Sequence, residues 1–203
     1  TTIPLPDLAN PAYYERARWA LREKAGDRYR VGGLPGFAFN VSRKLRPLDQ
    51  YLADLVLSPS LVRILARRVD DLLEEMIRQY AHIGVDAVMF PEDWGTQQGL
   101  MISPGLWREL FQPGFVRLCA AAHDHGLKVF MHSCGKMTAI IPDLIGAGID
   151  LLQFDQPRLH GLDVLAQWSG LVTFWCPVDI QTTLQTRDPA MIEAEVKLMI
   201  DLL

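Results

Sequence analysis

Amphipathic segments that end at a glycine and continue into a short apolar run recur along the chain. They read QYAHIGVDAVMF, AAAHDHGLKVFM and DLIGAGIDLLQF, at residues 79–90, 120–131 and 143–154. A glycine at this point is typical of a helix that ends in a left-handed residue, a conformation that glycine adopts without steric cost. The glycines concerned are Gly84, Gly126 and Gly148. The apolar runs do not alternate with polar positions, so they predict strands buried on both faces, as in a parallel sheet.

A proline after a capping residue marks the start of three predicted helices. These pairs are Ser58-Pro59, Ser103-Pro104 and Asp188-Pro189. The hydroxyl or carboxylate can accept a hydrogen bond from the first free amide groups, and proline already has the φ of a helical turn. Apolar residues follow Pro59 and Pro104 at helical spacing, so each helix is expected to pack on the sheet by one face. A kink is expected at Pro113 in the second helix.

Five predicted strands alternate with helices and favour a parallel α/β fold. The strands cover Arg30–Gly32, Val85–Phe90, Lys128–His132, Leu151–Phe154 and Val172–Trp175. Right-handed crossovers can curl such a chain into a barrel or into an open doubly wound sheet, and periodicity alone does not choose between them. No glycine-rich phosphate loop of the GxGxxG or GxxxxGK type follows a strand, which makes a nucleotide-binding open sheet less favoured.

The composition fits one soluble domain over residues 1–203. With 203 residues and 49% hydrophobic content the chain can bury a core of its own, and 22% charged residues suffice for a soluble surface. Nucleic acid is not an expected partner at a net charge of -4, because phosphate binding needs an excess of lysine and arginine. No apolar run reaches the ~20 residues of a membrane span, and three sparse cysteines suit a reducing compartment, so no membrane association and a cytoplasmic location are expected.

Chemistry is expected at the carboxyl ends of the strands, because the loops there build the sites of both α/β architectures. The first of these ends carries Glu92, Asp93, Trp94 and Gln97, directly after the strand that ends at Phe90. Two carboxylates, an indole and an amide can bind a metal, transfer protons or hold a polar substrate. The alternative is a loop in which a carboxylate caps the following turn, and an acidic pair alone does not separate the two.

A histidine and a cysteine two residues apart, His132 and Cys134, leave the next predicted strand. On a turn they can place an imidazole nitrogen and a thiolate on one Zn²⁺, which favours tetrahedral coordination by nitrogen and sulfur. The alternative is a buried cysteine beside a hydrogen-bonded histidine. For an isolated pair this alternative is the commoner outcome, because structural zinc motifs usually show four ligands.

The last predicted strand ends at Cys176 and Asp179. Cys176 is either a further soft ligand or a small buried residue, which is the commoner role of a lone cysteine. Asp179 either binds substrate or caps a turn. His123 and His125 precede a glycine at a helix C-terminus, where the helix dipole favours an exposed histidine, so we do not assign them to a metal.

Two longer segments strongly resemble the uroporphyrinogen decarboxylase superfamily. They read EDWGTQQGLMISPGLWRELFQP (Glu92–Pro113) and HGLKVFMHSCGKMTAIIPDLIGAGIDLLQFDQP (His125–Pro157). The superfamily contains porphyrinogen decarboxylases and zinc-dependent, corrinoid-linked methyltransferases, and the resemblance extends from about Tyr29 to the end of the chain. It implies a (β/α)8 TIM-type barrel that is incomplete here. The family's barrel is much longer, and its early strands and its last strand have no evident counterpart in this sequence.

The resemblance is closer to the methyltransferase branch, whose His-x-Cys pair binds zinc at this strand end. It implies Zn²⁺ on His132 and Cys134, with a cysteine of the last strand as third ligand beyond Leu203. Glu92 and Asp93 are then the expected catalytic pair, or complete the metal shell. The expected substrate-binding residues are Trp94, Gln97 and Asp179. Methyl transfer would use a small-molecule substrate and a corrinoid that a partner protein supplies, since the sequence has no DxHxxG cobalamin motif.

Two other functions stay open. The first is decarboxylation of a porphyrinogen, or of another pyrrolic or aromatic acid, without a metal. The arginine-rich loop and aspartate that porphyrinogen decarboxylases use have no match before Tyr29, and those enzymes lack the HSCG sequence at this strand end. The second is a non-catalytic binding module, in which a partner or a second copy in a homodimer covers the apolar surface that missing strands leave exposed.

Overall fold

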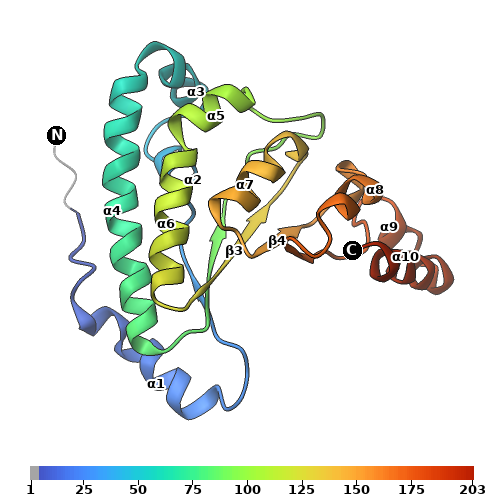
Figure 1. The fold of residues 1–203 in the computed structure, drawn as a ribbon, viewed down its shortest axis with the longest axis horizontal. Coiled ribbons are helices and arrows are strands. Elements are labelled where there is room, and N and C mark those ends of the chain that lie inside the picture. Colours follow the sequence, from blue (N-terminus) through green and yellow to red (C-terminus); the bar gives the residue numbers. More distant parts are fainter. Residues whose placement is uncertain (1–4) are drawn as a thin grey trace.

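Five parallel strands form one sheet in the computed structural model, which describes residues 5–203 (Figure 1). The strands are β1 (Val31–Gly33), β2 (Ala87–Pro91), β3 (Lys128–Ser133), β4 (Leu151–Phe154) and β5 (Thr173–Trp175). All five predicted strands are confirmed, with their ends shifted by two residues at most. They lie side by side in chain order, without the reversal of strand order that defines a doubly wound sheet. The fold is therefore part of a (β/α) barrel.

Helices connect the strands on one side of the sheet. They are α1 (Glu15–Lys24), α2 (Ala38–Ser42), α3 (Leu48–Leu57), α4 (Pro59–Ile83), α5 (Pro104–Leu110), α6 (Gln112–Asp124), α7 (Ile141–Ala147), α8 (Leu162–Leu165), α9 (Thr183–Thr186) and α10 (Pro189–Leu202). Short 3-10 turns cover Pro11–Tyr14, Thr138–Ile140, Pro157–Leu159 and Ala166–Trp168. Figure 1 shows α4 and α6 side by side, with α7 packed next to α6, whereas α8, α9 and α10 gather at the C-terminal end. No described helix has the length and apolar character needed to cross a membrane.

The three glycines of the recurring pattern have the predicted left-handed conformation. Their φ angles are 87° at Gly84, 74° at Gly126 and 107° at Gly148. Each turns the chain from the end of a helix into the next strand, and the amide of Gly84 donates to the carbonyl of Ala81, which the helix leaves free. The glycines of the recurring pattern therefore correctly predict where the chain enters β2, β3 and β4.

Two of the three predicted helix caps are present. The Ser103 hydroxyl accepts a hydrogen bond from the amide of Leu106 at 3.2 Å, and Asp188 accepts one from Ala190 at 2.9 Å. The cap predicted at Ser58 is wrong. Its backbone (φ −141°, ψ 48°) lies outside the extended region that directs a capping side chain toward the helix, and the side chain makes no such bond.

The kink predicted at Pro113 is a complete break between two helices. α5 ends at Leu110 and α6 begins at Gln112, so Pro113 stands in the first turn of a new helix. Proline is favoured there because its missing N–H would have no partner in the first turn in any case.

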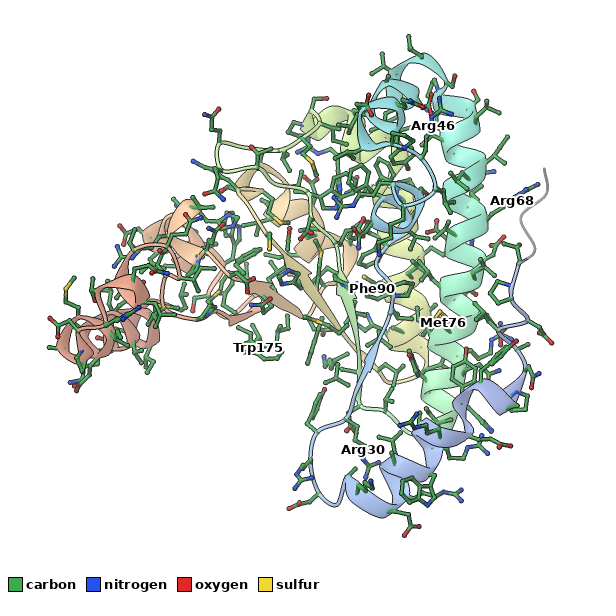
Figure 2. All side chains as sticks on the ribbon, turned by 180° about the vertical axis from the view of Figure 1, so that it is seen from behind. Arg30, Arg46, Arg68, Met76, Phe90 and Trp175 are labelled. Carbon is green, nitrogen blue, oxygen red and sulfur yellow. The ribbon has the colours of Figure 1, made fainter. Side chains whose placement is uncertain are left out.

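The core lies between the sheet and the helices, and aromatic rings make up much of it. The ring of Phe37 stacks between Phe90 of β2 and Phe115 of α6, with centroid separations of 3.9 and 3.7 Å. Figure 2 shows Phe90 on the side of the sheet that the helices cover. Met131 and Leu152 continue this buried layer on β3 and β4, with no exposed surface. This side of the sheet is called the helix face below.

The opposite side, called the lumen face, is open in the described chain. The strand register places two rows of residues across it. One row holds Gly33, Met89, Phe130, Leu151 and Thr173, and the row nearer the carboxyl ends holds Pro91, His132, Gln153 and Trp175. Trp175 is 57% exposed and projects away from α4 and α6 (Figure 2). In a closed barrel such a face lines the interior, with its carboxyl-terminal row at the mouth where sites form.

Candidate metal centre

Asp93, His132 and Cys134 bring three metal-capable atoms together at the carboxyl ends of β2 and β3. A carboxylate oxygen, an imidazole nitrogen and a thiol sulfur lie within 4.8 Å of one another. Sγ of Cys134 is 3.4 Å from Nε2 of His132, and this Nε2 is 3.7 Å from Oδ1 of Asp93. All three side chains are half-buried, so the cluster is partly shielded from solvent. These three residues are called the metal cluster below.

The spacing of the metal cluster fits zinc. Ligand distances of about 2.0–2.3 Å place the ligands of a tetrahedral zinc ion about 3.3–3.8 Å apart. The separations from Nε2 of His132 to the sulfur and to the carboxylate oxygen, 3.4 and 3.7 Å, fall within this range. Nitrogen, sulfur and oxygen are also donors that zinc accepts. The three side chains can therefore serve as ligands and leave one tetrahedral position for another group.

The backbone holds the two loops of the metal cluster together. Register pairs Pro91 with His132, and the amide of Glu92 continues the ladder by donating to the carbonyl of His132 at 2.8 Å. One residue further on, Oδ1 of Asp93 accepts a hydrogen bond from the amide of Cys134 at 3.0 Å. The pairing of β2 with β3 thus positions His132 and Asp93, and Cys134 follows on the turn that leaves β3.

Two residues of β4 and its loop surround the cluster from the other side. Nδ1 of His132 contacts Oε1 of Gln153, whose Nε2 donates to Oδ1 of Asp155 at 2.9 Å. The Cys134 thiol points at Oδ2 of Asp155 across 3.7 Å. Burial, together with the carboxylates of Asp93 and Asp155, raises the pKa of the Cys134 thiol to about 11. The thiol therefore keeps its proton at neutral pH unless a cation displaces it.

The C-terminal end of α2 supplies a positive charge through Arg43. Nη2 of Arg43 lies 3.3 Å from Oδ2 of Asp93, which leaves Oδ1 turned toward His132 and Cys134. Nε of Arg43 donates to the side-chain Oδ1 of Asn40 at 2.8 Å, and the side-chain Nδ2 of Asn40 donates to the carbonyl of Pro91 at 2.9 Å. Arg43 therefore orients the Asp93 carboxylate and partly balances its charge.

Glu92 lies outside the metal cluster. Its carboxylate has no exposed surface and accepts hydrogen bonds from the amides of Phe37 at 2.8 Å and Asn40 at 3.1 Å. Burial raises the pKa of Glu92 to about 8, against the lowering effect of these two hydrogen bonds. The residue expected as half of a catalytic pair therefore anchors the start of α2, the helix that ends at Arg43.

The predicted substrate-binding residues are placed in three different settings. The Trp94 ring is fully buried in the core, stacked on Phe39 with a centroid separation of 4.2 Å, and does not face the metal cluster. Asp179 is buried and caps a turn, the alternative that the sequence left open, by accepting hydrogen bonds from the amides of Gln181 and Thr182. Gln97 is exposed and donates to Gln156, on the loop after β4, at 3.1 Å. Gln97 is thus the accessible member of the set.

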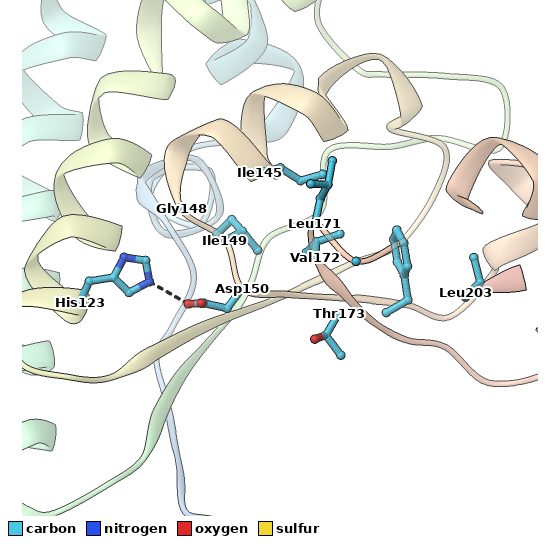
Figure 3. A pocket seen from close by; sticks show the side chains of 11 residues that line it. His123, Ile145, Gly148, Ile149, Asp150, Leu171, Val172, Thr173 and Leu203 are labelled. Atoms are coloured by element: carbon cyan, nitrogen blue, oxygen red, sulfur yellow. Dashed lines mark hydrogen bonds and ion pairs between the residues drawn. The ribbon is translucent and has the colours of Figure 1, made fainter. Parts of the chain in front are cut away.

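A cavity of about 480 Å³ lies at the opposite, amino-terminal ends of β4 and β5 (Figure 3). It is lined by His123, Ile145, Gly148, Ile149, Asp150, Gly170, Leu171, Val172, Thr173, Phe174 and Leu203. Nε2 of His123 contacts Asp150 at 2.7 Å, and the same carboxylate accepts from Lys128 and from the amide of Val129. This network joins the starts of β3 and β4. The cavity contains no residue of the metal cluster, and barrel enzymes place their chemistry at the other end.

Four residues near the metal cluster did not emerge from the sequence. They are Asn40, Arg43, Gln153 and Asp155. A search for polar side chains at strand ends would find Gln153 and Asp155 at the end of β4, whereas Asn40 and Arg43 lie in and at the end of α2, beyond the end of β1. No motif pointed to them because none of the four has a histidine or cysteine beside it in the sequence.

The family model of uroporphyrinogen decarboxylase (URO-D) matches residues 4–202 of the chain. Among solved structures, a methyltransferase from Methanosarcina mazei is similar to it, with a TM-score of 0.76 and 15% sequence identity. The match covers 94% of this chain and 55% of that one, so the chain spans little more than half the length of that methyltransferase. At this identity the likeness shows a shared fold and not a shared activity. No curated protein sequence matches the chain.

Proposed function

The chain belongs to the uroporphyrinogen decarboxylase family, and from this premise we propose that it forms the metal-binding part of a zinc-dependent methyltransferase. The observation that carries the proposal is the metal cluster, in which Asp93, His132 and Cys134 converge within 4.8 Å at the mouth of the barrel. The similar solved structure is itself a methyltransferase, which favours methyl transfer among the activities that a zinc site can support.

Zinc in this position would supply Lewis acidity, either to lower the pKa of an acceptor thiol or to activate a methyl donor. Within the chain, Arg43 directs Oδ1 of Asp93 into the cluster, and Gln153 holds the ring of His132. Gln97 is the residue we propose to bind a polar group of a small substrate, because it is exposed beside the loop after β4. The side chains of Phe90 and Trp94, which are close to Asp93 in the chain, are fully buried and keep water away from the helix face at this loop.

We also propose that a partner protein carries a corrinoid as the methyl carrier. The 203 residues contain no DxHxxG cobalamin motif, and the open lumen face would give a corrinoid carrier access to the metal cluster. Free methylcobalamin and a small thiol serve as probes for this step. The wild-type protein is expected to speed the transfer of the methyl group from methylcobalamin to the thiol, which is measured as the change in the absorbance of methylcobalamin. The His132→Ala/Cys134→Ala double variant is expected not to speed it.

Zinc content tests the metal site directly. Elemental analysis of the purified wild-type protein is expected to find close to one zinc per chain, and the His132→Ala/Cys134→Ala double variant is expected to lose it. His125→Ala removes an exposed histidine at the end of α6 and should retain zinc, which controls for surface binding. A folded wild-type protein without zinc would overturn the proposal and favour decarboxylation without a metal.

A further inference from the structure

Gln153 connects two ligands of the metal cluster from the neighbouring strand. It is the register partner of His132 on the lumen face, so its side chain lies beside the imidazole. One end of its amide contacts Nδ1 of His132, and the other reaches Oδ1 of Asp155 at 2.9 Å. Asp155 in turn accepts from the Cys134 thiol at 3.7 Å. His132, Gln153, Asp155 and Cys134 therefore form a ring of contacts that closes between Sγ and Nε2 at 3.4 Å.

The carboxylate of Asp155 fixes which way the Gln153 amide points. An amide can be turned over so that its oxygen and nitrogen exchange places, and its neighbours decide between the two orientations. A carboxylate offers only acceptor atoms, so the amide NH2 must face Asp155. The amide oxygen then faces His132. An oxygen can only accept, so Nδ1 of His132 must carry the proton of a neutral imidazole.

We propose that Gln153 is a positioning residue that holds His132 in the tautomer protonated at Nδ1. Nε2 then presents its lone pair toward Cys134 and Asp93, at 3.4 and 3.7 Å, which is where a shared cation would sit. The inference rests on the proposed zinc site, because a metal binds the nitrogen without a proton. Through Asp155, the same amide also holds the orientation of the Cys134 side chain relative to the imidazole.

The tautomer of His132 is measurable without any metal. Two-bond 1H–15N correlation spectra of the metal-free, 15N-labelled protein report which ring nitrogen is protonated, and His132→Ala assigns the signal. Wild type is expected to show the proton on Nδ1. Gln153→Leu removes the acceptor at similar size and should release His132 to a mixture of tautomers. Gln153→Glu restores an acceptor oxygen and should restore the wild-type tautomer.

Zinc affinity provides the second measurement, by competition with a chelator. Gln153→Leu is expected to raise the Kd for zinc roughly 10–100-fold, the range found when a hydrogen-bond partner of a metal-binding histidine is removed. Gln153→Glu should lie closer to wild type. Gln79→Leu, which removes a glutamine from α4 far from the cluster, should change neither the tautomer nor the Kd.

The outcomes separate this inference from the proposed function. A wild type that binds no zinc overturns the proposed function, and the tautomer comparison between wild type and Gln153→Leu still decides the role of Gln153. A wild type that binds zinc, with an unchanged tautomer and Kd in Gln153→Leu, overturns the inference alone. If Gln153→Leu does not fold, Gln153→Asn withdraws the amide by one methylene and carries the same expectations.

Discussion

The separation of the two metal-binding loops depends on a contact between two glycines. A Cβ on Gly135 would lie 2.3 Å from the carbonyl carbon of Gly95, and the φ of Gly135 is +74°. Asp93 and Cys134 stand within two residues of this contact. We predict that Gly135→Ala lowers the free energy of unfolding by about 1–3 kcal/mol, because it combines left-handed strain with a clash. It should also raise the Kd for zinc, since the loops must separate.

Gly126→Ala is the matched control for this prediction. Gly126 has the same φ of +74°, and a Cβ there would meet nothing within 4 Å. Its replacement should cost only the conformational strain, about 1 kcal/mol, and leave zinc binding unchanged. Urea unfolding and chelator competition on both variants measure the difference. Equal losses of stability with unchanged zinc affinity would show that the glycine contact does not set the cluster geometry.

The residue alternation of β2 explains which site predictions the structure brings together. Alternation continues past the end of the strand, so Pro91 and Asp93 point to the lumen face while Glu92 and Trp94 are fully buried on the helix face. The sequence pattern indicates the correct loop but does not separate its polar residues from its aromatic ones. Continuing the two-residue period of β2 from Pro91 to the next position on the same face selects Asp93 and leaves out Glu92 and Trp94. The same extension on β4 selects Gln153 and Asp155.

At the scale of elements, α4 and α6 pack closely around one buried acid. Asp70 of α4 is 5% exposed, and a Cβ on Gly114 of α6 would lie 2.7 Å from its Oδ2. Its Oδ1 has no hydrogen-bond partner among the described residues. Burial raises the pKa of Asp70 from 3.8 to about 6, against the lowering effect of Arg117. The carboxyl group is thus held in a space that favours its neutral form.

This buried acid makes the stability of the helix pair depend on pH. A folded-state pKa above the unfolded value means that the folded state binds more protons, so the stabilisation is complete below pH 3.8 and is lost as pH rises through about 6. Asp70→Asn removes the titration. Between pH 4 and 7 we expect the free energy of unfolding of wild type to fall relative to Asp70→Asn, by up to about 3 kcal/mol.

Urea unfolding of both proteins at several pH values within this window checks the expectation. Asp27→Asn, on an exposed loop, provides the control and should follow wild type. Parallel curves for wild type and Asp70→Asn would mean that Asp70 is ionised throughout and that Arg117 outweighs the burial.

Element prediction succeeded where the chain repeats one physical pattern and failed where elements are short. Glycine at helix ends and unbroken apolar runs located the central strands, because both signals are local. The four- and five-residue helices α2, α8 and α9 are too short to show a helical period. α1 went unrecognised for another reason. It buries no residue, so it has no apolar stripe to detect.

At the scale of the whole molecule, strand order decided what periodicity left open. Barrel and doubly wound sheets share the same alternation of strands and helices, and only the order in space separates them. The order β1-β2-β3-β4-β5 makes every connection a step to the next neighbour, which brings the ends of β2, β3 and β4 to one mouth. The metal cluster and the residues around it follow from that arrangement.

The open lumen face leads to the last prediction, which concerns association. Met89, Phe130 and Leu151 are only half-buried there, and the edge residue Trp175 is 57% exposed. Apolar surface of this extent is normally covered, by further strands or by another copy of the chain. We therefore expect the 203-residue chain on its own to associate through this face, with a mass in light scattering that increases with concentration.

Trp175→Lys tests whether the lumen face is the surface responsible. Burying an exposed indole contributes roughly 2 kcal/mol at about 25 cal/mol per Å², so its replacement should weaken association at least about tenfold. Trp19→Lys is the matched control, because Trp19 is 54% exposed but lies on α1, away from the lumen face. Equal weakening by both variants would assign association to general surface hydrophobicity. A wild-type chain that stays monomeric at every concentration would contradict the prediction and show that the lumen face remains in water without a partner.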